Sequence, residues 1–492
     1  MAGGLIPHIP PPMTPDQLKN QHLLWRAGFG PMAEQYQQLS TATTFGYVNA
    51  LFKASSKVPV YIDIAGTAVE GLMTGINDLS LQSKKQLTPD QRRQMRTASR
   101  QQIRNLNLAW MDEMVNSEQQ LREKMSLFWH GHFASRNINI LYQQQLLHVI
   151  RKNALGSFGD LLQEVSKSAA IINFLNNNQN RKDHPNENFA REVMELFTLG
   201  RGNYSETDIR EAARAFTGWG TNLQGDFVFR KFQHDDGQKT LFGKKGNYNG
   251  DEVLQLLLEK KQTAVFITRK IYRFFVNETV DEQRVLLLAE KFFQSNYDIS
   301  ALMRAIFSSD WFYDAKNIGC RIKSPVELLA GIQRVLPMKV ENKAVFLLMQ
   351  NLMGQLLFYP PNVAGWPGGK SWIDSSSLML RLRIPAMFSD TQELNMSPKA
   401  DDDQQMGMAD TVKKPGGQKQ LIRADIQWEK YIPRFSGVPR EALLPAISNL
   451  LLQTPYTNVT GTIEKHIDGS SRENFIRSAT IRLMSTPEYQ LC

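Results

Sequence analysis

The sequence predicts a mainly α-helical, multi-helix globular protein that carries one small β-hairpin and a central polar cleft. Apolar residues recur at the spacing of a helix face along most of the chain. Capping residues, prolines and glycines stand at the ends of these stretches, as helix boundaries require. Strand-like periodicity is confined to residues 227–243. A hydrophobic content of 42% in 492 residues is sufficient for a large core in two or more lobes.

Composition divides the chain into four regions. We expect residues 1–15, which are rich in proline, to be a flexible arm, and residues 16–390 to form the helical core. Residues 391–420 contain DDDQQ and KKPGGQKQ and almost no apolar groups, so they are expected to be a mobile linker or insertion. Residues 421–492 return to helical periodicity and should pack back on the core.

The first expected helix lies within residues 17–31 and breaks at a Gly-Phe-Gly-Pro turn. His22 and Arg26 are one turn apart on it, so Arg26 is a candidate for substrate binding, with a buried packing role as the alternative. A long helix is expected from Pro89 to about Asn116, and the arginines on its first two-thirds form a solvated face or contact phosphate.

The next candidate site is the histidine pair at His130 and His132. The preceding helix is expected to end near Gly131. In an extended segment, residues i and i+2 point to one side, which would suit a divalent metal ion; in a continuing helix they diverge by about 200°. The other interpretation is a structural pair that hydrogen-bonds to the backbone.

Residues 184–219 are the stretch richest in chemically capable side chains. Apolar spacing predicts a helix from Pro185 to Gly200, and Ser205 with Asp208 forms a capping box for the next. The polar face of the first helix and its surroundings supply candidate catalytic residues (Glu187, Glu192, Glu195) and candidate substrate-binding residues (Asn188, Arg191, Trp219). The alternative is a solvated face of i,i+4 ion pairs.

The expected hairpin pairs residues 227–232 with residues 239–243 around a His-Asp-Asp-Gly turn. His234 and Asp235 would lie at its tip, either as acid/base groups or as solvated turn residues. Helices are expected over most of residues 251–357. The loop at residues 359–378 then presents Trp366 and Trp372 as aromatic platforms for substrate.

Composition also excludes several classes of protein. The net charge of +9 is modest and the basic residues are scattered, so nucleic acid is an unlikely partner. The two cysteines, Cys320 and Cys492, rule out a disulfide framework and a cysteine-rich zinc module. With no signal peptide and no apolar run of membrane-spanning length, we expect a cytoplasmic protein without membrane contact. GxGxxG, P-loop and GxSxG motifs are absent.

Six segments together resemble a known bacterial family. They are HLLWRAGFGP, FWHGHFAS, NENFAREVMELFTLGRGNYSETDIREAARAFTGW, FQHDDGQKTLFG, SPVELLAG and PPNVAGWPGGKSWI. Their order and near-complete coverage resemble the family catalogued as domain of unknown function 1800, although residues 391–420 depart from its pattern. The resemblance implies no defined activity. It does imply a neighbouring gene product similar to sulfatases and alkaline phosphatases, which is a candidate protein partner.

Two functional hypotheses follow from a composite site in which these segments converge. The first is a hydrolase-like enzyme whose substrate is a polar small molecule or glycan, such as a carbohydrate or an ester. The carboxylates would be its acid/base groups, and the histidine pair could hold a divalent metal. The second is a non-catalytic binding or assembly protein that works with the sulfatase- or phosphatase-like neighbour, in which the same polar residues form a structural network.

Overall fold

The computed structural model describes residues 15–66, 89–222, 224–390, 392–394, 420–454 and 463–492. The expected arm, apart from Pro15, and most of the expected insertion lie outside this part of the chain. Helices dominate the described residues, and strands form only two-stranded antiparallel sheets, so the mainly α class is confirmed. No helix in the described ranges combines the length and apolar character that crossing a bilayer requires.

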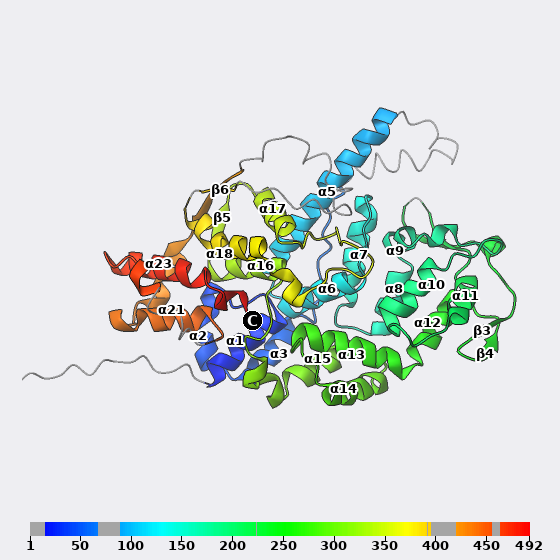
Figure 1. The fold of residues 1–492 in the computed structure, drawn as a ribbon, viewed down its shortest axis with the longest axis horizontal. Coiled ribbons are helices and arrows are strands. Elements are labelled where there is room, and N and C mark those ends of the chain that lie inside the picture. Colours follow the sequence, from blue (N-terminus) through cyan, green and yellow to red (C-terminus); the bar gives the residue numbers. More distant parts are fainter. Residues whose placement is uncertain (1–14, 67–88, 223, 391, 395–419, 455–462) are drawn as a thin grey trace, which may run out of the picture.

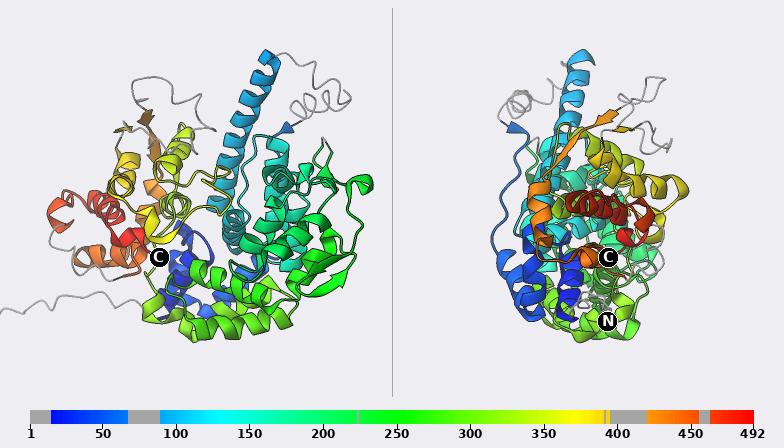
Figure 2. Two further views of the ribbon diagram at one scale, coloured as in Figure 1. Left: turned by 45° about the vertical axis from the view of Figure 1, so that its right-hand side comes forward. Right: turned by 90° about the vertical axis from the view of Figure 1, so that its left-hand side faces the viewer.

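The helices surround two hydrophobic cores (Figure 1). The first core is built mainly by helices on the right and lower side of Figure 1: α3 (Thr44–Ala54), α8 (Phe158–Ser166), α9 (Ala169–Phe174), α10 (Asn188–Glu192), α11 (Glu206–Ala215), α12 (Gly250–Leu258), α13 (Lys261–Phe275), α14 (Glu282–Gln294) and α15 (Ile299–Phe307). The second is built mainly by α5 (Pro89–Asn116), α16 (Pro325–Val335), α17 (Ala344–Leu352), α18 (Ser375–Ser389), α21 (Leu443–Leu451) and α23 (Arg472–Met484). In both views of Figure 2, the N-terminal end of α5 projects beyond the other helices.

Three helices contribute to both cores: α1 (Pro15–Ala27), α6 (Gln120–His132) and α7 (Ile140–Asn153). On α6, Met125 and Trp129 pack into the first core and Leu127 packs into the second. Almost every residue of α6 is buried, including the charged side chains of Arg122, Glu123 and Lys124. This helix is therefore the central element of the fold.

Local sequence explains the helix boundaries. Ser205 and Asp208 form the predicted capping box at the start of α11. Ser324 and Glu327 form another at the start of α16, where Pro325 occupies the first turn. Residues Asn188–Glu192 (α10) and Val193–Thr198 form one continuous helix, here called the signature helix. Gly200, at φ 77°, follows its end, as expected for a C-terminal glycine.

The predicted strand pairing was wrong. Strand β2 (Phe227–Phe229) pairs with β1 (Trp219–Thr221), and β3 (Lys239–Leu241) pairs with β4 (Lys244–Gly246). The tight turn between β3 and β4 is Phe242-Gly243, both with positive φ, which is the conformation that two-residue hairpins favour. The Asp-Gly pair expected to turn the chain instead follows a buried His234 and an ion-paired Asp235.

A buried ion pair joins α6 to α16. Lys124 of α6 hydrogen-bonds Glu327 of α16, and both side chains are almost completely buried. Lys124 also donates to the carbonyl of Trp25 at 3.2 Å, which brings in α1. Burial alone would raise the pKa of Glu327, but Lys124 and Arg321 outweigh that effect and hold the pKa below its ordinary value. The carboxylate is therefore ionised and compensated.

Removing the charge of Glu327 should strongly destabilise the protein. In Glu327→Gln, the ammonium of Lys124 remains buried without a carboxylate, so the free energy of unfolding should fall by about 3–5 kcal/mol. Asp112→Asn is the control, because it breaks the exposed Lys343–Asp112 pair and should cost less than about 1 kcal/mol. Urea unfolding monitored by circular dichroism measures both, and equal small losses would contradict this account.

Candidate functional site

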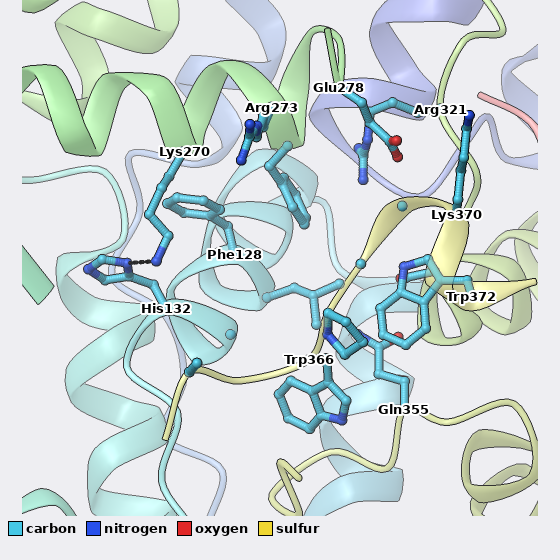
Figure 3. A pocket seen from close by; sticks show the side chains of 18 residues that line it. Phe128, His132, Lys270, Arg273, Glu278, Arg321, Gln355, Trp366, Lys370 and Trp372 are labelled. Carbon is cyan, nitrogen blue, oxygen red and sulfur yellow. Dashed lines mark hydrogen bonds between the residues drawn. The ribbon is translucent and has the colours of Figure 1, made fainter. Parts of the chain in front are cut away.

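A pocket of about 530 Å³ lies between α6, α13, the start of α16 and the loop at residues 364–372 (Figure 3). Its walls combine basic and aromatic side chains with one carboxylate. The labelled lining residues are Phe128, His132, Lys270, Arg273, Glu278, Arg321, Gln355, Trp366, Lys370 and Trp372. Three of the residues predicted for the site, His132, Trp366 and Trp372, are among them.

The two predicted metal-binding histidines do not converge. Helix α6 continues through His132, so the imidazoles of His130 and His132 point about 200° apart around its axis. His130 Nε2 accepts a hydrogen bond from the Phe358 N–H at 3.2 Å, and burial lowers the pKa of His130 to about 3. Within the described residues, no three His, Cys, Asp or Glu side chains cluster as metal ligands would. The residues present do not fit a metal held by this pair.

His132 instead links two elements that are distant in sequence. Its Nε2 lies 3.2 Å from the Phe197 carbonyl oxygen, and its Nδ1 lies 2.8 Å from Lys270 Nζ (Figure 3). A carbonyl can only accept, so Nε2 carries the proton and Nδ1 accepts from Lys270. Burial, reinforced by the charge of Lys270, holds the pKa of His132 well below its ordinary value, which keeps the ring neutral.

Lys270 is the residue of the pocket whose protonation state best suits acid/base chemistry near neutral pH. Burial lowers the pKa of its amine to about 8. No carboxylate of the described residues lies within ion-pair distance of Nζ, and its hydrogen bond goes to neutral His132. An amine with this pKa is partly unprotonated near neutral pH and can act as a base.

The signature helix positions His132 through its C-terminal end. Residues Val193–Thr198 form a π-helical turn in which the Leu199 N–H bonds the Met194 carbonyl at 2.8 Å. Carbonyls near a helix end lack intrahelical donors and are satisfied by side chains. Phe197 is such a residue, and its carbonyl receives the imidazole of His132.

Gly365 lets the tryptophan loop approach the backbone of α6 at Gly131. Gly365 has φ 83°, and a Cβ atom built on it would lie 2.4 Å from the Gly131 carbonyl oxygen. This close backbone contact brings Trp366 against His130, with ring centroids 5.4 Å apart. The loop that the sequence singled out therefore forms one wall of the pocket.

The predicted catalytic carboxylates lie elsewhere. Arg191 pairs with Glu187 at 3.2 Å and with Glu206 at 2.8 Å, which is the ion-paired face that the sequence left as the alternative. Glu195 accepts a hydrogen bond from Tyr204, and burial followed by repulsion from Glu195 raises the pKa of Glu192. None of these side chains is among the described residues that line the pocket.

The other predicted residues have structural partners. Asn188 donates to the Leu175 carbonyl at 3.0 Å, and Trp219 is buried against Phe216. His234 Nδ1 lies 2.9 Å from the Thr217 carbonyl oxygen.

Two more predicted site residues lie outside the pocket. Asp235 accepts from Arg214 at 2.7 Å, and this bond lowers the pKa of Asp235. Arg26 is fully buried and donates to the Asn317 carbonyl at 2.7 Å. The structure therefore does not bring these predicted site residues together with the tryptophans.

Sequence reasoning missed most of the charged pocket residues. Lys270 and Arg273 are three residues apart on α13, a spacing that places them on one face and could have indicated a shared site. Arg321 precedes the capping box of α16, and Lys370 lies between the two tryptophans of the loop. Only Glu278 supplies a negative charge among the described lining residues.

Fold and pocket define a helical protein in which a lysine–histidine pair faces a tryptophan loop. The chain belongs to the family described as protein of unknown function (DUF1800), which matches residues 22–491. No curated protein and no solved structure matches the chain.

The ionisation of Lys270 can be tested without a substrate. Acetylation by acetic anhydride, followed by mass spectrometry over a pH series, should show half-maximal reactivity of Lys270 at about pH 8. Lys244 is the control, because its hydrogen bond to Glu259 raises its pKa, so it should react only at higher pH. Reaction of both lysines at the same pH, about 10 or above, would contradict the assignment.

The two glycines at the contact should respond oppositely to alanine. Gly365→Ala places a methyl group against the Gly131 carbonyl at a positive φ and should lower the free energy of unfolding by roughly 1–3 kcal/mol. Gly131→Ala meets no atom within 4 Å in the last turn of α6 and reduces the freedom of the unfolded chain, so it should raise that free energy by about 0.4–1 kcal/mol. Urea unfolding compares the two. Similar effects of both variants would argue against this loop contact.

Proposed function

We propose that the protein is a hydrolase-like enzyme that binds a polar substrate, a carbohydrate or an ester, in the pocket between α6, α13 and the tryptophan loop. The observation that carries the proposal is the amine of Lys270, which faces the pocket with neutral His132 as its hydrogen-bond partner. Hydrolysis of a glycosidic or ester bond is accelerated by a base that takes a proton from the attacking water, which an unprotonated amine can do near neutral pH.

In the proposed mechanism Lys270 is the general base. The unprotonated amine keeps an N–H bonded to His132 Nδ1, which leaves its lone pair available to take a proton from a water molecule in the pocket. The Phe197 carbonyl fixes the imidazole through Nε2, so His132 is a positioning residue. Water that loses its proton to Lys270 attacks the scissile centre, and protonated Lys270 can return that proton to the leaving group.

The tryptophans give the pocket its affinity for ring-shaped substrates. Trp366 and Trp372 both line it, and the flat faces of indoles suit the apolar faces of sugars or aromatic esters. Because the donor set does not fit a metal held by His130 and His132, the proposal includes no metal step.

A second candidate function is a non-catalytic binding or assembly protein that works with a sulfatase- or phosphatase-like partner. The observation that favours it is the network at Glu187, Arg191 and Glu206, whose charges pair with one another on the surface of the signature helix. Such a network supports a fold or a docking face without chemistry.

Replacing Lys270 should remove catalysis while binding persists. With a panel of p-nitrophenyl glycosides and esters, wild-type hydrolysis should rise with pH through about 8, because only the unprotonated amine is a base. Lys270→Met should lower kcat by about 100-fold or more and abolish that rise. Lys244→Met, at an exposed pair remote from the pocket, is the control and should behave as wild type.

The Glu187→Gln variant distinguishes catalysis by Lys270 from catalysis by the carboxylate of Glu187 at the start of the signature helix. Its carboxylate lies outside the described pocket lining, so hydrolysis should persist in a folded Glu187→Gln protein. Unchanged hydrolysis in folded Lys270→Met, or its loss in Glu187→Gln alone, would overturn the assignment of the base.

A further inference from the structure

We infer that the substrate carries an anionic group, a carboxylate, sulfate or phosphate, that is bound by Arg273, Arg321 and Lys370 in this pocket. The inference rests on the proposed function of the pocket as a substrate site and names the substrate class. It concerns binding alone, so it can be tested separately from hydrolysis.

The charge of the pocket is the first observation that supports an anionic substrate. Four basic side chains, Lys270, Arg273, Arg321 and Lys370, line the described walls, and Glu278 is the one acidic side chain among them. A concave surface lined by one sign of charge concentrates ligands of the other sign. The overall charge of +9 is modest for this length, so the imbalance is a local property of the pocket.

Arg321 is the anchor of the proposed anion site. It is only 6% exposed, and its guanidinium lies 4.7 Å from the centre of the Phe274 ring. Its guanidinium forms no hydrogen bond with a described residue. Nη1 is buried and lies 3.8 Å from Glu327, which Lys124 already hydrogen-bonds. A buried guanidinium with spare donors binds a planar or tetrahedral anion strongly.

The backbone holds Arg321 in place. Its N–H donates to the Cys492 carbonyl at 3.1 Å, and its carbonyl accepts from the Cys492 N–H at 2.8 Å. An anion bound there would meet a donor that needs little reorganisation, which favours affinity.

Arg273 and Lys370 complete the site from two other elements. Arg273 lies one turn after Lys270 on α13, and Lys370 belongs to the tryptophan loop. Both are exposed, and no carboxylate of the described residues is within ion-pair distance of either. In Figure 3 they lie with Arg321 along one side of the pocket, and Trp366 lies across from them. A sugar stacked on a tryptophan could therefore direct a charged substituent towards these cations.

The start of α16 does not supply the anion contacts. The Ser324 and Glu327 N–H groups are bonded within the capping box, and the Val326 N–H donates to Gln355 Oε1 at 3.0 Å. Pro325 has no N–H. The contacts must therefore come from side chains, which substitution can remove one at a time.

The test is equilibrium binding to the full-length protein, by isothermal titration calorimetry. The probes are glucuronate, glucose 6-sulfate, glucose 6-phosphate and neutral glucose, which share a ring and differ in the charged group. We expect at least one anionic sugar to bind at least tenfold more tightly than glucose, and its affinity should fall with added salt. The preferred probe identifies the anion.

Variants locate the site. Lys370→Gln and Arg273→Gln should each lower the affinity for the preferred anionic sugar by about tenfold and leave the affinity for glucose unchanged. Arg321→Gln should lower the affinity for this sugar further. If Arg321→Gln fails to fold, the variants at the exposed residues Lys370 and Arg273 still test the inference. Lys244→Gln is the control with the same loss of charge at an exposed position outside the pocket.

The outcomes are distinct from those of the catalytic test. Anionic sugars that bind no better than glucose, no detectable binding of any probe, or binding unaffected by Lys370→Gln and Arg273→Gln would each overturn the inference. Lys270→Met should retain a clear preference for the anion, since the proposed contacts remain. Anion binding without hydrolysis would leave the inference standing and remove the proposed base catalysis.

Discussion

The pocket depends on the buried contact between Lys124 and Glu327. That carboxylate caps α16 through the Ser324 N–H and compensates the ammonium on α6, which in turn donates to the Trp25 carbonyl on α1. Helix α6 carries His132, and the segment before α16 carries Arg321, so one ionised group fixes two walls of the same cavity. A buried ion pair adds little net stability, but breaking it is costly, which makes the arrangement of the walls difficult to alter.

The signature helix contributes to this site indirectly. Its polar face is occupied by ion pairs with neighbouring helices, and its C-terminal end offers the Phe197 carbonyl to His132. The carbonyl, the imidazole and the amine of Lys270 then form a chain in which each group fixes the next. This explains how a stretch so rich in carboxylates can lie beside a pocket without lining it.

Local patterns predicted the helices, because helix periodicity and the Ser205 capping box are properties of adjacent residues. Loop composition likewise singled out the segment with Trp366 and Trp372, which lines the pocket. The residues that line the pocket could not be grouped from local patterns, because they come from distant segments: His132 and Lys270 are 138 residues apart. The hairpin failed for a related reason. Asp-Gly is the stronger local turn signal, yet tertiary pairing placed the turn at Phe242-Gly243.

Lys323 and Lys270 are two lysines whose pKa is lowered by desolvation, and their partners differ. Lys323 lies 3.6 Å from the centre of the Trp25 ring and 3.9 Å from that of Tyr489, and it donates to the Tyr489 carbonyl at 2.7 Å. Even so, burial lowers the pKa of Lys323 to about 7. Among the described residues, the amine of Lys270 contacts a neutral imidazole and one aromatic face, and it borders the pocket. Desolvated cations without counterions cost stability. In the proposed complex, an anionic substrate would supply a counterion to Lys270 and a second one to Arg321, which shares Glu327 with Lys124.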